Sequence, residues 1–278
     1  MPETNAVAIR GGRARASRLS LRFVALLYLS ALLFIPVGLV AYKTFQPGIS
    51  QVWASITTPA AQHAFMLTIE VAALAVPLNA AFGVITALAL VRGRFPGKRL
   101  IEALIDLPFA ISPVVVGLAL LLLYGREGWF GPTLTNAGIQ IIFSFPGILL
   151  ATVFITLPFV VREVSPVLRE IGDEQEQAAS TLGASSWQSF WRITLPSIRW
   201  GLTYGIVLSV ARAIGEFGAV SVVSGKISGE TETLTLLVEK RFNNFDLSGA
   251  YAASTLLALI ALAVLAAMVF VNRRRDSE

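Results

Sequence analysis

Six long apolar runs constrain the fold of this chain more than any other feature. They cover residues 23–42, 65–91, 100–124, 141–161, 198–223 and 250–271. A helix needs roughly 20 apolar residues to cross a bilayer, so each run is long enough to span a membrane. Only 14% of residues are charged, against about 25% in soluble domains. We therefore expect an all-α integral membrane protein with six transmembrane helices in residues 23–271, and no large soluble domain.

The first run resembles a signal peptide, because a basic segment precedes it. The arginines of this segment are Arg10, Arg13, Arg15, Arg18 and Arg22. The run is longer than a usual signal core, however, and no small-x-small cleavage site follows it. We expect a retained helix, with residues 1–22 as a basic cytoplasmic tail.

The distribution of positive charge predicts the orientation in the membrane. If the N-terminus is cytoplasmic, sixteen of the 22 Lys and Arg residues fall on the cytoplasmic side. Five fall outside: Lys43, Arg126, Lys226, Lys240 and Arg241. Basic residues favour cytoplasmic connections, so this bias predicts that both termini are cytoplasmic, residues 272–278 forming the second tail. The net charge of +5 then reflects topology and anionic lipid rather than nucleic acid. We expect a multi-pass protein of a bacterial inner (plasma) membrane.

The longest cytoplasmic connection, residues 162–197, ends in an amphipathic stretch, QAASTLGASSWQSFWRITLP. Its apolar stripe is interrupted at Gly183, which predicts two short helices meeting at a glycine turn. Pro196 is expected to start the next span, since proline fits the first turn of a helix. Such a stretch is either an interfacial helix on lipid headgroups or a docking surface for a soluble partner.

The same stretch resembles the EAA loop of ABC importer permeases. Six positions match that motif at every spacing: Ala178, Ala179, Gly183, Ile193, Leu195 and Pro196. The resemblance implies a coupling helix that inserts into a groove of a separate ATP-binding subunit. The family's glutamate is replaced by Gln177, which removes one expected ion pair with the ATPase. Glu174 or Glu176 would substitute for it, or the Gln177 amide would form a hydrogen bond.

Residues 107–125 and 211–239 narrow the resemblance to permeases of sulfate and molybdate importers, and most closely to the W-type subunit of sulfate/thiosulfate importers. This family implies a type I (MetI-like) permease architecture. It also implies a homologous T-type permease, two copies of an ATPase and an extracytoplasmic sulfate-binding protein. No cofactor is expected on this chain, because ATP and magnesium would bind the ATPase. Permeation of molybdate, tungstate or another oxyanion remains the alternative.

The chain lacks the residues of a catalyst. It has no phosphate-binding G-x4-G-K-[ST] loop, no cysteine and one histidine, His63, which we expect to be solvated at the membrane interface. Metal and thiol chemistry are therefore not expected, and a membrane enzyme would need a cluster of such groups. An ion-coupled secondary transporter is a less favoured alternative, because no internal repeat is evident.

Polar residues inside the runs are the candidates for a translocation path, because buried charges in a membrane face an interior. Arg212 and Glu216 lie four residues apart and so share a helix face. They form either a structural ion pair or part of an anion route. Ser112 precedes Pro113 and marks a kink or a cavity, whereas Glu70 is either a helix contact or a gate. We expect Glu102 and Asp106 near the cytoplasmic start of a helix, where capping by its amides and solvation at the membrane interface explain them. The outer loop 224–248 is expected to contact a binding protein, to fold back into the permease, or to be a solvated surface loop.

Overall fold

The computed structural model describes residues 4–275, with side chains of residues 23–264 and 266. The described chain is helical and contains no strands. Its long helices are α1 (Thr4–Phe45), α3 (Pro59–Arg92), α7 (Phe145–Ile171), α10 (Leu195–Ile214) and α13 (Leu247–Arg275). Shorter ones are α2 (Ile49–Ile56), α4 (Lys98–Ala110), α5 (Pro113–Tyr124), α6 (Gly131–Asn136), α8 (Glu174–Thr181), α9 (Ser186–Ser189), α11 (Val220–Val223) and α12 (Leu234–Asn243), with a π-helical turn at Phe190–Thr194.

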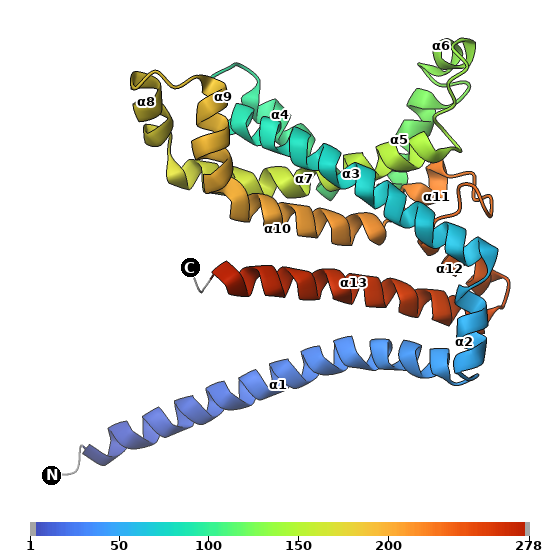
Figure 1. The fold of residues 1–278 in the computed structure, drawn as a ribbon. Coiled ribbons are helices and arrows are strands. Elements are labelled where there is room, and N and C mark those ends of the chain that lie inside the picture. Colours follow the sequence, from blue (N-terminus) through green and yellow to red (C-terminus); the bar gives the residue numbers. More distant parts are fainter. Residues whose placement is uncertain (1–3, 276–278) are drawn as a thin grey trace.

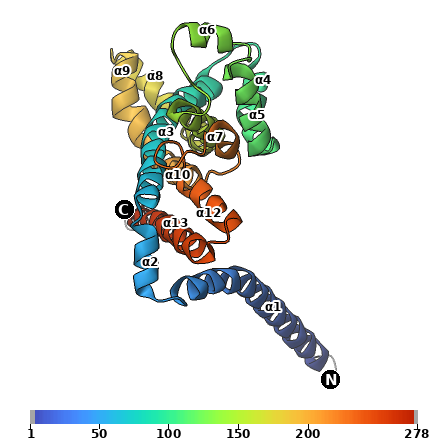
Figure 2. The ribbon, with the colours of Figure 1, turned by 90° about the vertical axis from the view of Figure 1, so that its right-hand side faces the viewer.

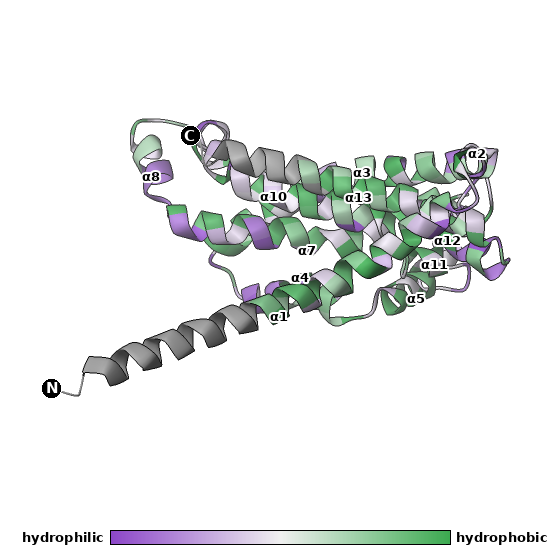
Figure 3. Cartoon of the chain, turned by 90° about the horizontal axis from the view of Figure 1, so that it is seen from below, coloured by the Kyte–Doolittle hydropathy of each residue, from purple (hydrophilic) through white to green (hydrophobic). Residues whose placement is uncertain are grey.

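The long helices lie lengthways in one bundle (Figure 1). Helices α8 and α9 are at one end of it, and α2, α11 and α12 are at the other. Figure 2 shows α1 extending away from the other helices. Hydrophobic residues prevail along the middle of the bundle, and hydrophilic ones gather toward its ends (Figure 3). This is the distribution that a bilayer requires.

Four helical segments are long and apolar enough to cross a membrane: Phe23–Phe45, Pro59–Arg92, Phe145–Ile171 and Leu247–Val264. They correspond to the first, second, fourth and sixth runs. Helix α1 begins at Thr4, so the expected tail 1–22 is helical where it is described. Residues 1–3 and the last three residues of the second tail, 276–278, lie outside the described residues.

The sequence predicted one transmembrane helix for the third run, with a kink or a cavity at Ser112. The structure divides this run into two helices. Helices α4 and α5 are bent by 115° relative to each other. Ser112 has φ −59° and ψ 135°, an extended conformation, and Pro113 starts α5. Proline offers no amide hydrogen and disfavours a helical conformation in the residue before it, so the helix ends there. The bend is thus a complete break of the span rather than a mild kink.

The fifth run is also interrupted, which corrects a second prediction. Helix α10 ends at Ile214 instead of continuing to Val223, and it is not one of the four segments that are long and apolar enough to cross a membrane. The Glu216 carboxylate accepts a hydrogen bond from the Ala219 amide at 2.9 Å. This bond satisfies the amide of the residue that precedes α11, where a new short helix begins.

Small residues allow α10 to pack closely on α7. A Cβ atom added to Gly205 would lie 2.9 Å from Val160 Cα, and one on Gly201 would lie 2.8 Å from the Glu163 carbonyl oxygen. This G-x3-G spacing, typical of membrane helix interfaces, was not used in the sequence analysis. Near Glu216, a Cβ atom added to Gly218 would lie 2.8 Å from Pro113 Cβ, whereas one on Gly215 would meet only the Ala211 carbonyl oxygen, at 3.6 Å.

A buried polar contact joins α3 to α7 in the same region. Asn79 is fully buried, and its Nδ2 donates to Thr156 Oγ1 at 2.6 Å and to the Val153 carbonyl at 3.1 Å. Ser209 Oγ on α10 also lies 3.4 Å from the Thr156 carbonyl oxygen. Helices α3, α7 and α10 therefore form the rigid centre from which the other segments are positioned.

Candidate functional site

The amphipathic segment at the α8 end forms the helix–turn–helix that the sequence predicts. Helix α8 and helix α9 meet at Gly183, whose φ is +86°. The Gly183 and Ala184 amides donate to the Ser180 and Ala179 carbonyls, both at 3.0 Å. Glycine adopts this left-handed conformation without a steric penalty, which explains its position after the helix end.

Two features of the segment differ from the sequence-based description. Helix α7 continues to Ile171, so the connection begins at Gly172 and not at residue 162. A π-helical turn at Phe190–Thr194 leads directly into α10, with Pro196 in its first turn. Ser185 and Gln188 form a capping box that starts α9. The connecting segment is therefore shorter than the sequence suggested, and local hydrogen bonds hold its turn and the start of α9.

The turn presents an apolar surface to solvent. Leu182 is 89% exposed, Trp187 69% and Trp191 51%. The rings of Trp187 and Trp191 have centroids 5.5 Å apart, and Phe190 lies 5.5 Å from Trp191. Exposed large aromatic side chains of this kind mark surfaces that bind another macromolecule or the membrane interface.

The motif residues divide between this surface and the bundle. Gln177, Ala178 and Gly183 are exposed, Ala179 is half-buried, and Pro196 is exposed at the start of α10. Ile193 and Leu195 are half-buried, and Leu195 packs against the cluster around Val164 and Ile198. The first half of the motif is thus available to a partner, while the second half holds the segment on the bundle.

Glu176 is engaged inside the molecule. Its Oε2 lies 3.3 Å from Arg92 Nε at the end of α3, and its Oε1 accepts from Thr194 Oγ1 at 2.7 Å. Only 24% of its side chain is exposed. Glu176 therefore does not replace the missing motif glutamate on the outer surface, whereas Glu174 is exposed.

Arg212 and Glu216 form an ion pair at the α10–α11 break, with Nη2 and Oε2 2.8 Å apart. The Glu216 side chain is 1% exposed and that of Arg212 33% exposed. Glu216 is therefore shielded, and it holds Arg212 at the edge of the bundle. Such an arrangement leaves a partly compensated positive charge accessible to an anion.

The two other path candidates are exposed on separate elements. Ser112 lies at the bend between α4 and α5, and Glu70 lies on the outer face of α3. Within the described residues, Glu70 has neither a hydrogen bond nor an ion pair. Among the described residues, neither Ser112 nor Glu70 shares a hydrogen bond or an ion pair with Arg212 or Glu216.

Glu102 and Asp106 do not cap a helix, which was one of the two roles that the sequence predicted for them, although both are partly exposed. Helix α4 begins at Lys98, so both lie beyond its first turn. They pair instead with α7, Asp106 with Arg162 at 2.9 Å and Glu102 with Arg169 at 3.4 Å. These partly exposed pairs border a cavity of about 330 Å³ between the two helices. They tie α4 to α7 at the α8 end of the bundle.

The loop 224–248 folds back onto the bundle, one of the arrangements that we expected for it. The Leu234 amide donates to Thr68 Oγ1 on α3 at 2.9 Å. Glu232 is 1% exposed and pairs with Lys240 at 3.0 Å. Burial of this segment excludes a simple solvated loop.

His63 on α3 is not freely solvated, contrary to the sequence-based prediction, since its Nδ1 is buried and has no hydrogen-bond partner among the described residues.

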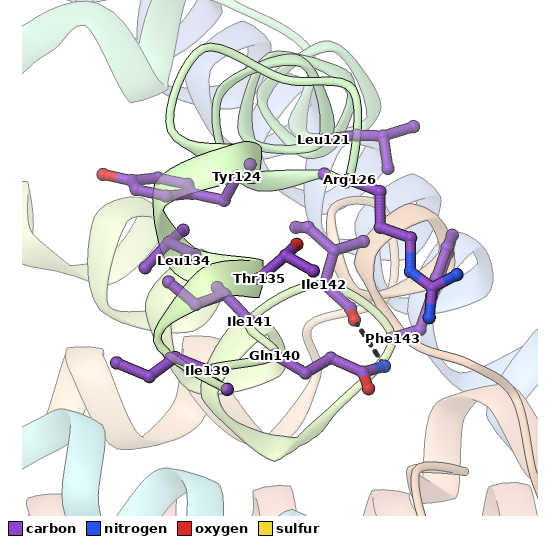
Figure 4. Close-up of a pocket in the computed structure, with 13 residues that line it drawn as sticks. Leu121, Tyr124, Arg126, Leu134, Thr135, Ile139, Gln140, Ile141, Ile142 and Phe143 are labelled. Atoms are coloured by element: carbon purple, nitrogen blue, oxygen red, sulfur yellow. Dashed lines mark hydrogen bonds between the residues drawn. The ribbon is translucent and has the colours of Figure 1, made fainter.

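A cavity of about 500 Å³ lies at the opposite end from α8. Figure 4 shows its lining, which comes from the end of α5, from α6 and from the segment after it. Arg126 is its charged residue, and Gln140 Nε2 donates to the Ile142 carbonyl at 3.2 Å. Sequence reasoning did not find this cavity, because apolar residues with no distinctive spacing form most of it.

Comparison with known proteins identifies relatives along most of the chain. Residues 79–277 match the family described as "Binding-protein-dependent transport system inner membrane component". The sulfate transport system permease protein CysW of Synechococcus elongatus is 49% identical over 256 residues, covering 92% of this chain and 90% of that protein. CysW of Escherichia coli is 46% identical, covering 87% and 83%. CysT of S. elongatus is 41% identical, covering 86% of each.

A solved structure has the same fold. It is a bacterial ABC transporter involved in the import of the acidic polysaccharide alginate, and the matched chain gives a TM-score of 0.77 at 17% identity. The match covers 95% of this chain and 98% of that one. A bacterial alginate ABC transporter in complex with an alginate pentasaccharide-bound periplasmic protein also gives a TM-score of 0.77, at 17% identity. The helical arrangement is therefore that of an ABC importer permease.

Proposed function

Because the chain belongs to the family of inner membrane components of binding-protein-dependent transport systems, we propose that it is a permease subunit of an ATP-driven sulfate importer. The observation that carries the proposal is 49% identity with a sulfate permease over nearly the full length of both proteins. The chain is a transport subunit and makes no covalent change to its substrate.

In the proposed topology the chain crosses the membrane six times, with α4 and α5 together as the third crossing and α10 in the fifth. Both termini and the α8–α9 segment face the cytoplasm of a bacterial cell. The charge bias of the connections supports this orientation, since basic residues favour the cytoplasmic side. The position of α8 and α9 at one end of the bundle also supports it (Figure 1).

The proposed assembly contains a second permease, two ATPase subunits and an extracytoplasmic sulfate-binding protein. Similarity to both CysW and CysT sequences supports a heterodimer of homologous permeases, W-type and T-type. ATP and magnesium bind the ATPase subunits, and this chain holds no cofactor. The exposed, largely apolar face of α3 and the unpaired Glu70 then face the second permease or the path between the two.

The α8–α9 surface is the proposed coupling site. Small residues at 178 and 179 let α8 lie close to a groove, and Leu182 and Trp187 provide apolar contact area. Gln177 offers an amide in place of a carboxylate, so docking here depends on packing and neutral hydrogen bonds at this position, and the exposed Glu174 is the carboxylate of α8 that remains available for an ion pair.

Transport proceeds by alternating access in this proposal. ATP binding closes the ATPase dimer and moves the coupling segment, and the bundle rocks from inward-open to outward-open. Sulfate then passes from the binding protein into the path, where Arg212 attracts it. Because Glu216 compensates Arg212 at 2.8 Å, the site attracts a dianion without holding it too tightly for turnover.

Reconstitution in liposomes tests the function. The chain is purified with its ATPase and T-type permease, and radioactive sulfate uptake is measured with loaded binding protein and ATP. We expect uptake to need ATP hydrolysis and to stop with a non-hydrolysable analogue. Uptake driven by an ion gradient without ATP would contradict the proposal. Stimulation of hydrolysis by molybdate-loaded but not sulfate-loaded binding protein would reassign the substrate.

A further inference from the structure

Helix α8 is weakly anchored by its own packing. It buries none of its residues. Glycines flank it on both sides, Gly172 with φ +64° and Gly183 with φ +86°. Because glycine has a wide conformational range, such flanks do not fix the direction of a short helix. Another contact must hold α8 if its movement is to reach the bundle.

Arg92, the last residue of α3, provides that contact. Its guanidinium lies against Glu176 of α8, with Nε 3.3 Å from Oε2 and Nη2 3.4 Å from Oε1. The same group donates to the Leu168 carbonyl at 3.3 Å and to the Gly172 carbonyl. A cation at the C-terminus of a helix is favoured by the exposed carbonyls, so Arg92 also caps α7.

Glu176 extends this contact to the next element. Its Oε1 accepts from Thr194 Oγ1 at 2.7 Å, and Thr194 is 3% exposed at the junction of the π-helical turn and α10. One guanidinium and one carboxylate thus connect α3, α7, α8 and the start of α10. The two charged side chains are 23% and 24% exposed, so water screens the pair less than it screens a surface salt bridge.

The position beside Glu176 strengthens the assignment. Successive residues of a helix point about 100° apart, and Gln177 is exposed where Glu176 is turned inward. The neutral residue thus faces outward and the charged one faces the bundle. The Glu176 carboxylate is therefore placed for a contact within the chain, whereas Glu174 is exposed.

We propose that the Arg92–Glu176–Thr194 contact is a positioning link that makes α3 and α10 move together with the coupling helix α8. The inference rests on the proposed function, since it needs an ATPase that moves α8. Helix α3 packs along α7 through Val84, Ala87 and Leu90. Motion delivered to Arg92 therefore enters the rigid centre of the bundle, rather than being absorbed at the glycines.

The first test uses Glu176→Gln in the complete transporter, with Glu102→Gln as its matched control. Both changes remove one carboxylate charge from an ion pair with arginine at the same end, but Glu102 joins α4 to α7. We expect both variants to co-purify with the ATPase. Stimulation of ATP hydrolysis by sulfate-loaded binding protein should fall about fivefold or more in Glu176→Gln alone, the lower range of typical coupling effects. Arg92→Lys keeps the positive charge but loses the planar guanidinium that donates to several acceptors at once, so its stimulation of ATP hydrolysis should lie between those of the two glutamine variants.

The second test measures distance directly. Since the chain has no cysteine, spin labels can be placed at Arg94→Cys and Gln175→Cys without background. The label distance should stay constant between nucleotide-free and ATP-bound states, and should change or broaden when Glu176→Gln is added. A change of this distance in the otherwise unmodified protein would refute the link.

The remaining outcomes separate the link from simpler explanations. Equal stimulation in Glu176→Gln and Glu102→Gln would overturn the inference. Loss of ATPase binding in Glu176→Gln alone would assign the pair to keeping α8 folded and would also overturn it. Failure of the unmodified chain to bind an ATPase would contradict the proposed function itself, and the link with it.

Discussion

Replacing Gly205 by alanine tests whether the α7–α10 contact sets the stability of the bundle. The added Cβ would lie 2.9 Å from Val160 Cα and 3.4 Å from Glu163 Cβ. Carbon atoms prefer separations of about 3.5–4.0 Å. The two helices must therefore move apart by roughly 0.6 Å or more, and the backbone of α7 cannot yield as the tip of a side chain would.

The expected loss of stability is the difference between two opposing contributions to the free energy of unfolding. Overpacking of a close contact costs about 1–3 kcal/mol, whereas alanine in place of glycine regains roughly 0.5–1 kcal/mol of helix propensity. The net destabilisation is then about 1 kcal/mol, between limits of roughly 0 and 2.5 kcal/mol. No hydrophobic force between helices in lipid offsets it, because packing itself drives their association.

Unfolding of the purified chain by dodecyl sulfate in mixed micelles, followed by circular dichroism, measures this difference. Gly215→Ala is the matched control, since its Cβ would meet no atom closer than 3.6 Å and its φ of −89° suits alanine. We expect Gly205→Ala to unfold at lower detergent fraction and Gly215→Ala to match or exceed the parent. Equal stability of both variants would refute the packing argument.

Two further changes address the coupling segment and the charge pair. Gly183→Ala forces alanine into a left-handed conformation that costs an L-residue roughly 1–2 kcal/mol, so less ATPase should co-purify with this variant. Gly229→Ala is the control, because Gly229 has φ +83° at the other end of the bundle, and it should leave co-purification unchanged. Equal loss of ATPase in both variants would contradict a local effect at Gly183. Glu216→Gln removes the negative charge that compensates Arg212. Because Arg212 is 33% exposed, we expect a destabilisation of roughly 1–2 kcal/mol, below that of a fully buried pair, together with slower sulfate uptake. Unchanged unfolding and unchanged uptake would show that the pair has no role.

Sequence alone predicted the helical class and four of the long apolar helices, because a bilayer imposes a minimum length that composition reveals directly. It also predicted the turn at Gly183, since a glycine between two amphipathic segments is a local signal. Spacing of four residues sufficed to predict that Arg212 and Glu216 lie together. In each of these correct predictions, the residues that determine the structure lie in one continuous stretch of the chain.

The features that were missed depend on residues far apart in the chain. Asp106 and Arg162 meet only because α4 lies beside α7, so local charge suggested a helix cap instead. Arg92 and Glu176 are likewise brought together by the packing of α3 on α7. The break after Ile214 was hidden because its cause, a carboxylate that bonds the Ala219 amide, is invisible in a hydropathy pattern.

The two interrupted spans meet in space. Gly218, after the break of α10, lies against Pro113 at the start of α5, and Gly117 of α5 lies against the Ala219 carbonyl. Each break frees peptide groups that hydrocarbon cannot solvate. Helix α5 therefore rests on α11, whereas α4 is paired with α7 through Asp106 and Glu102. In the proposed topology, the two halves of one crossing are thus held by different parts of the bundle, and a bent span of this kind does not transmit a displacement along a single axis as a straight helix would.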